Sequence, residues 1–197
     1  MTSLSPVVDE TARSVLALLL SRDPTLGSTR LLCVDGPAGS GKTTLSAALL
    51  RAAPKSRQLE LVHMDDLYEG WSGLEAGMRR VADDVITPLR HDEPGRYRRY
   101  DWVRGELAEE HLVTPVDVLV VEGVGAGNVA YADDITVLVW VETPSDVRLD
   151  RGISRDGEPL REHWQAWKAQ EDAVFAEHRA RARADVVVDG RTGLSGG

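Results

Sequence analysis

The sequence predicts an α/β fold in which five parallel strands form one sheet and helices cover both of its faces. Two observations support this. Short apolar runs rich in β-branched residues alternate with longer amphipathic segments, which is the pattern of a parallel sheet with crossover helices. A glycine-rich loop also follows the first of these runs. With 197 residues, the chain is long enough for one domain with a sizeable core.

The individual elements follow from periodicity and from capping residues. Each predicted strand is an apolar run of strand length, and the five runs are 30–35, 58–64, 117–122, 135–141 and 184–188. An opening helix is expected to begin at Ser5-Pro6, because serine caps helices and proline suits the first helical position. Further helices are expected at about 41–53, 73–87, 104–112, 144–155 and 159–182.

The glycine-rich loop matches the pattern G-x-x-x-x-G-K-[ST], which is the P-loop of nucleotide-binding proteins. Its glycines would let backbone amides turn toward phosphate oxygens at the start of the next helix. Lys42, one of three lysines in the chain, would reach the β and γ phosphates, and Thr43 would contact Mg²⁺. The pattern therefore predicts a site for ATP and Mg²⁺. The expected nucleotide-binding residues are Gly36, Pro37, Ala38, Gly39, Ser40, Gly41, Lys42, Thr43 and Thr44.

Acidic residues follow two other predicted strands, at the edge of the sheet where ligands of α/β proteins bind. Asp65 and Asp66 follow the second strand. Asp65 is the candidate for a catalytic base or a metal-side carboxylate, while one of the two aspartates could simply cap the next turn. Glu122 ends the third strand and is a Walker-B-like candidate for the Mg²⁺ environment.

Three arginines, Arg148, Arg151 and Arg155, fall on one face of the helix predicted after the fourth strand. Guanidinium groups suit phosphate oxygens, so a segment that closes over the site could use them to stabilise transferring charge. The alternative is an exposed helix on which nearby aspartates pair with these arginines. The expected catalytic residues are Lys42, Asp65, Arg148, Arg151 and Arg155.

Composition narrows the class of partner. The net charge of −9 argues against nonspecific binding to nucleic acid or anionic membranes, so a small-molecule partner is expected. The first ten residues have no signal-peptide pattern, and no apolar run is long enough to span a bilayer. A cytoplasmic protein is therefore expected, with monomer and homo-oligomer both open. Cys33 is the only cysteine, which rules out an intrachain disulfide.

Several segments together resemble the uridine kinase-like branch of the P-loop kinases. They are the P-loop, Asp65-Asp66-Leu67-Tyr68, Tyr100-Asp101-Trp102, Val121-Glu122-Gly123 and the stretch 148–156. In that family the loop is followed, in this same order, by Asp-x-Phe-Tyr, Tyr-Asp-Phe, Glu-Gly and an arginine-rich lid. Leu67 and Trp102 depart from the family's phenylalanines, and the His-Pro-x-x-Phe-Asp stretch that holds the nucleoside sugar has no counterpart here.

The resemblance implies a three-layer P-loop NTPase fold of the nucleoside and nucleotide kinase type, in one domain. It implies an arginine-bearing lid at about 146–160 and an acceptor-side insertion at about 66–112. By the same resemblance Asp65 corresponds to the aspartate that activates the acceptor, and Thr43 and Glu122 correspond to the Mg²⁺ environment. With Asp65 as a candidate metal-side carboxylate, the expected metal-site residues are Thr43, Asp65 and Glu122. The expected acceptor-binding residues are Asp65, Tyr68, Arg99, Tyr100, Asp101 and Trp102.

Trp71 and Trp102 could stack an acceptor base or could pack a helix against the sheet. Trp164 and Trp167 fall at helical spacing and are expected in the core.

The predicted activity is transfer of the γ-phosphoryl group of ATP to a small metabolite, most of all a nucleoside. The alternative is a P-loop ATPase or an ATP-binding regulatory protein that has no small-molecule acceptor. A GTPase is excluded because the only asparagine, Asn128, is followed by valine and not by the lysine that the guanine-selecting motif needs.

Overall fold

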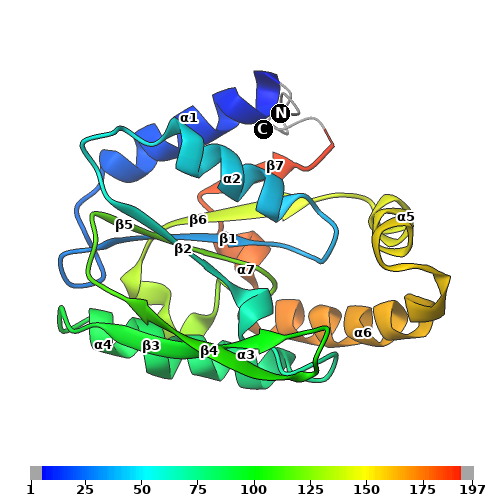
Figure 1. The fold of residues 1–197 in the computed structure, drawn as a ribbon. Helices are drawn as coiled ribbons and strands as arrows, with labels where there is room; N and C mark the ends of the chain where they lie inside the picture. Colours follow the sequence, from blue (N-terminus) through cyan, green and yellow to red (C-terminus); the bar gives the residue numbers. More distant parts are fainter. Residues whose placement is uncertain (1–5, 192–197) are drawn as a thin grey trace.

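The structure, a computed structural model, describes residues 6–191. Within that range a five-stranded sheet in the order β2-β5-β1-β6-β7 forms the centre of the molecule (Figure 1). Every neighbouring pair of these strands is parallel. Their bounds are β1 Arg30–Asp35, β2 Leu59–His63, β5 Val118–Glu122, β6 Ile135–Glu142 and β7 Val186–Asp189. The predicted α/β fold with five parallel strands is confirmed.

Helices cover both faces of the sheet, as Figure 1 shows. One face carries α1 (Pro6–Leu20) and α2 (Lys42–Ala52), which pack against each other and against the sheet. The other layer and the edge beside it contain α3 Leu74–Arg80, η2 Val81–Ile86, α4 Thr87–Leu89, η3 Val129–Asp134, α5 Ser145–Asp156, η4 Glu158–Leu160, α6 Arg161–His178 and α7 Ala180–Arg183. The helix α5 lies beyond the carboxyl ends of the strands, next to the connection between β1 and α2.

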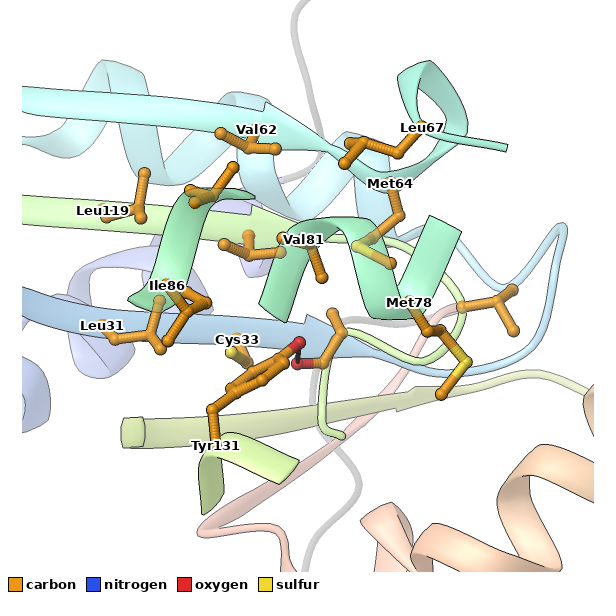
Figure 2. Packing of buried hydrophobic residues seen from close by; sticks show 14 of the residues in the cluster. Leu31, Cys33, Val62, Met64, Leu67, Met78, Val81, Ile86, Leu119 and Tyr131 are labelled. Atoms are coloured by element: carbon orange, nitrogen blue, oxygen red, sulfur yellow. Dashed lines mark hydrogen bonds between the residues drawn. The ribbon is translucent and has the colours of Figure 1, made fainter. Parts of the chain in front are cut away.

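The core has two parts because successive side chains of a strand point to opposite faces. Leu32 and Val34 of β1 pack with α1 and α2. Leu31 and Cys33 belong to the other cluster, where Figure 2 shows them directed toward the layer that carries Ile86. Burial raises the pKa of the Cys33 thiol well above its usual range. Cys33 is thus a small core residue, as its place in an apolar strand predicts.

The helix expected at 104–112 is wrong. This segment forms β4 (Glu106–Val113), which pairs antiparallel with β3 (Gly95–Asp101). Its residues are good helix formers, but cross-strand pairing outweighs that local preference. Arg99 donates to Glu109 across the hairpin, at 2.7 Å from Nε to Oε1.

Other helix bounds differ in detail. The helix expected at 73–87 is divided into α3, the π-helical turn η2 and α4. The helix expected at 159–182 ends at His178, because Arg179 adopts a left-handed conformation with φ of 50° before α7 begins. The predicted opening helix is α1, and the proposed cap Ser5 lies outside the described residues. Between residues 6 and 191, no helix is both long and apolar enough to cross a membrane.

Candidate active site

A cavity of about 890 Å³ opens at the carboxyl ends of the strands. The residues that follow β1, β2, β5 and β7 all reach it, because the parallel strands end at the same edge of the sheet. Its lining includes Gly39, Gly41, Lys42, Thr43, Asp65, Tyr68, Trp71, Trp102, Glu122, Arg151, Arg155, Asp156, Trp164, Trp167 and Gly190. One continuous space therefore joins the P-loop to an aromatic region beyond Asp65.

The P-loop turns through three glycines with positive φ, Gly36 (139°), Gly39 (76°) and Gly41 (106°). At Gly36 a side chain is also excluded by space, because a Cβ there would lie 2.1 Å from the carbonyl oxygen of Val141. Lys42 is 7% exposed, and its Nζ donates to the Pro37 carbonyl at 3.0 Å. The loop thus has the curvature and the cation that a phosphate chain requires.

Asp35, the last residue of β1, fastens the P-loop to the segment after β5. Its carboxylate is 1% exposed and accepts the backbone N–H groups of Gly36 at 2.7 Å and of Gly125 and Gly127 at 2.9 Å each. Burial raises the pKa of Asp35, and the three amides oppose that increase. Asp35 therefore holds two backbone segments of the site in place.

Glu122 lies between Thr43 and His63. Its Oε1 accepts from the Thr43 hydroxyl at 3.0 Å and lies 2.6 Å from Nδ1 of His63. Burial raises the pKa of Glu122, but the hydrogen bond from His63, the charge of Lys42 and the Thr43 hydroxyl outweigh burial and leave the pKa below its ordinary value. The hydrogen bond to Glu122 in turn raises the pKa of His63.

Asp65 lines the cavity from the short turn Met64–Asp66 (η1) after β2, and its backbone carbonyl accepts the indole N–H of Trp102 at 2.9 Å. Asp65 is exposed on the side that faces the cavity. The protein atoms packed around its carboxyl shield it from water and so raise its pKa. The charge of Lys42 opposes this increase, whereas that of Glu122 adds to it. Asp66 is absent from the cavity lining and feels the charges of His63, His111 and Arg99 toward the hairpin.

An aromatic wall encloses the end of the cavity beyond Asp65. Trp71 makes edge contacts with Trp102, Trp164 and Trp167, at centroid distances of 5.6, 6.1 and 6.1 Å. Tyr68 packs on Trp167 at 5.1 Å. Trp164 and Trp167 are buried as predicted, but they also line the cavity, which their helical spacing did not indicate.

The three arginines of α5 have different surroundings. Arg155 and Arg151 line the cavity; the Arg155 guanidinium lies 5.6 Å from the Trp164 ring centroid and binds Asp156 through two nitrogens. Arg148 is absent from the cavity lining. It lies behind the P-loop and donates to the Ala38 carbonyl at 3.1 Å.

Three of the residues expected around an acceptor lie outside the cavity lining. Arg99 pairs with Glu109 and with Asp101. Asp101 accepts the backbone N–H groups of Val103 and Arg104, so it organises the turn between β3 and β4. Tyr100 packs on Trp102, which lines the cavity, at a centroid distance of 5.5 Å. Tyr68 is in the lining, but its hydroxyl donates to the Val124 carbonyl at 2.6 Å.

The model of the phosphoribulokinase and uridine kinase family matches residues 73–170, a stretch that contains Glu122, α5 and the two tryptophans of α6. The match covers just under half of the chain, which resembles this family over that stretch. A uridine kinase of Staphylococcus epidermidis is 27% identical over 146 residues, which cover 66% of this chain and 70% of that protein. A uridine kinase of Lactococcus lactis is 29% identical over 143 residues, 65% and 69% of the two chains.

Solved structures agree on the fold. A possible uridine kinase from Bacillus stearothermophilus superposes with a TM-score of 0.63 at 20% identity, and the alignment covers 92% of this chain and 96% of that one. The predicted resemblance to the uridine kinase-like branch is confirmed, and these likenesses support a small-molecule kinase.

Three features of the site escaped sequence reasoning. His63 and Glu122 are partners in the register of β2 and β5, so their contact required knowing that these strands are neighbours. Asp35 looks like the end of an apolar strand, and nothing in its sequence surroundings indicates the amides that it binds. Asp156 binds Arg155 and also lines the cavity, whereas the sequence indicates only that aspartates near the arginines could pair with them.

Proposed function

We propose that this chain is an ATP- and Mg²⁺-dependent kinase that transfers the γ-phosphoryl group to a hydroxyl of a nucleoside. The observation that carries the proposal is the continuity of the cavity, whose lining joins Lys42 and Thr43 to Asp65 and then to the aromatic wall. A donor site and an acceptor site that share one cavity suit direct transfer between two bound molecules.

The donor half fits a nucleoside triphosphate. Glycine φ angles shape a phosphate cradle at the start of α2, and Lys42 is held in it. The hydroxyl of Thr43 and the carboxylate of Glu122, 3.0 Å apart, are oxygen ligands of the kind that Mg²⁺ takes directly or through water. When bound, Mg²⁺ would neutralise phosphate charge. Among residues 6–191 no group of three or more His, Cys, Asp or Glu could form a metal site alone.

Asp65 is the proposed base. The acceptor oxygen forms a bond to the γ phosphorus as the bond to the β,γ-bridging oxygen breaks, and ADP departs with that oxygen. The proton of the acceptor hydroxyl passes to Asp65. Burial raises the pKa of this carboxyl, which increases its affinity for the proton.

The helix α5 is the proposed lid. Arg155 and Arg151 line the cavity and would compensate the charge that spreads over the phosphoryl oxygens. Arg148 contributes indirectly, because it holds the outside of the P-loop. The stretch 66–112 is the proposed acceptor-side insertion, of which Trp71 and Trp102 contribute to the cavity lining.

The aromatic wall supports a nucleoside as the acceptor. Trp71, Trp102 and Trp164 provide flat apolar surface at the end of the cavity beyond Asp65, and such surface suits a planar ring. The relatives in Staphylococcus epidermidis and Lactococcus lactis are uridine kinases. A ring placed on the wall would leave its sugar hydroxyl near Asp65.

The proposal is tested by measuring ADP formation from ATP against a panel of nucleosides, sugars and vitamin alcohols, with a reaction that lacks any acceptor. We expect ADP formation to rise at least tenfold with one or more nucleosides. Equal ADP formation with and without every acceptor would contradict the proposal and would favour the ATPase or regulatory alternative.

A further inference from the structure

Glu171 is a buried acidic residue that the transfer reaction described above does not use. It lies in α6 and is 1% exposed, which is rare for a carboxylate without a structural or functional reason. Burial raises the pKa of Glu171, and the amide of Ala38 and the charges of Lys42 and Arg148 oppose that increase. Its contacts explain why it is tolerated there.

The carboxylate of Glu171 connects the two halves of the cavity. Oε1 accepts the backbone N–H of Ala38, in the P-loop, at 2.6 Å. The same oxygen accepts the indole N–H of Trp167, in the aromatic wall, at 2.9 Å. Trp167 and Glu171 are four residues apart, so they share one face of α6.

Arg148 completes the arrangement from the lid helix α5. Its Nη1 lies 3.5 Å from Oε2 of Glu171 and donates to the Ala38 carbonyl at 3.1 Å. Both polar backbone groups of Ala38 are therefore bound by side chains, one from α6 and one from α5. The outer turn of the P-loop is fixed relative to both helices.

We propose that Glu171 is a positioning residue that fixes the P-loop relative to the Trp167 wall, so that the donor site and the acceptor site are held in one alignment. Glu171 is absent from the cavity lining. This inference rests on the proposed nucleotide site and adds a connection between its two ends. Because Glu171 binds both Trp167 and Ala38, a change at Trp167 is expected to alter nucleotide affinity through Glu171.

The test uses the full chain and measures binding of the Mg²⁺ complex of AMP-PNP, a nonhydrolysable ATP analogue, by titration calorimetry. Glu171→Gln keeps an oxygen that can accept from Ala38 and Trp167, so its dissociation constant should stay within about threefold of the unaltered protein. Glu171→Ala removes both bonds and should raise the dissociation constant about tenfold or more, since hydrogen bonds to a charged group each contribute an appreciable factor. Asp172→Ala, at an exposed neighbour that pairs with Lys168, is the control and should have no effect.

Trp167→Phe separates positioning from general stability. It keeps an aromatic ring and removes the indole N–H, so we expect a twofold to fivefold weaker affinity for the analogue. In a Glu171→Ala background the same change should have no further effect. Additive effects of the two substitutions, or an unchanged affinity in Glu171→Ala, would overturn the proposal. A tenfold loss in Glu171→Gln would also overturn it.

If Glu171→Ala does not fold, the effect of Trp167→Phe on analogue affinity is measured in two backgrounds, the unaltered protein and Glu171→Gln. We expect Trp167→Phe to weaken binding in both, because the oxygen of glutamine can still accept the indole N–H. An analogue affinity that Trp167→Phe leaves unchanged would refute the proposal. Lys42→Ala distinguishes this failure from failure of the proposed function. Unchanged analogue affinity in Lys42→Ala would remove the nucleotide site itself, independently of Glu171.

Discussion

Replacement of Asp35 by asparagine tests how the site is held together. The carboxylate accepts three backbone N–H groups, two through Oδ1 from Gly36 and Gly125 and one through Oδ2 from Gly127. Asparagine has one acceptor oxygen and one donor NH₂. If the oxygen keeps Gly36 and Gly125, the NH₂ faces the N–H of Gly127, and one buried donor loses its partner.

The magnitude follows from these bonds. Loss of one charge-assisted bond costs about 1.5–3 kcal/mol, and the unpaired amide of Gly127 adds to that cost. The two remaining bonds weaken because the acceptor is no longer charged. Release of the burial penalty that raises the pKa of Asp35 offsets part of the loss. We expect the free energy of unfolding to fall by about 2–4 kcal/mol, which for a chain of this size lowers Tm by roughly 5–12 °C.

Urea unfolding followed by circular dichroism, with Tm from calorimetry, measures this change. Asp172→Asn is the matched control, because Asp172 is exposed and its pair with Lys168 is a surface contact, worth less than about 1 kcal/mol. A loss in Asp35→Asn below about 0.5 kcal/mol, equal to that of the control, would refute the reasoning.

Three further predictions concern the lid, the acidic network and the base. In Gly152→Ala the new Cβ would lie 2.4 Å from Cζ2 of Trp164. We therefore expect the free energy of unfolding to fall by about 1–3 kcal/mol. An unchanged Tm would show that α5 can shift away from α6 without cost. The pKa of Glu122 is lowered from 4.5 and that of His63 is raised from 6.5, so their pairing contributes fully to stability between pH 4.5 and 6.5. This contribution is lost as the pH falls through the pKa of Glu122 or rises through the pKa of His63 in the folded protein. The difference in stability between the unaltered protein and His63→Gln should peak in that window, at about 1 kcal/mol or less because His63 is partly exposed, and a difference that does not vary with pH would count against the pair. Asp65→Asn should lower kcat by about 10²–10⁴ with analogue affinity within about threefold, and an unchanged kcat would remove Asp65 from the proposed role.

The sheet was predictable from the sequence because parallel strands buried on both faces are continuous apolar runs. The P-loop was predictable because its geometry requires glycines at fixed spacing. The β4 strand was not predictable, since Glu106–Val113 has local preferences for helix and becomes a strand by pairing with β3. Arg96 and Arg99 of β3 add ion pairs with Glu110 and Glu109.

The candidate site also has some features that the sequence predicts and others that it does not. The positions of Asp65 and Glu122 at strand ends were predictable, because all parallel strands of a sheet present their carboxyl ends at one edge. The different surroundings of Arg148 and Arg155 were not predictable, since spacing along a helix indicates only that the two residues share a face. Glu171 was also missed, because its partners Ala38 and Trp167 become neighbours only when α6 packs beside the P-loop.

The central claim is that phosphate passes directly from the P-loop to an acceptor hydroxyl in one cavity. Phosphorus-31 NMR of a reaction with ATP, Mg²⁺ and the nucleoside that most stimulates ADP formation tests this claim most directly. We predict that the γ-phosphate signal is replaced by a phosphate monoester signal in equal amount, and that Lys42→Ala abolishes the exchange. Inorganic phosphate in place of the monoester, at a rate independent of the nucleoside, would contradict the account.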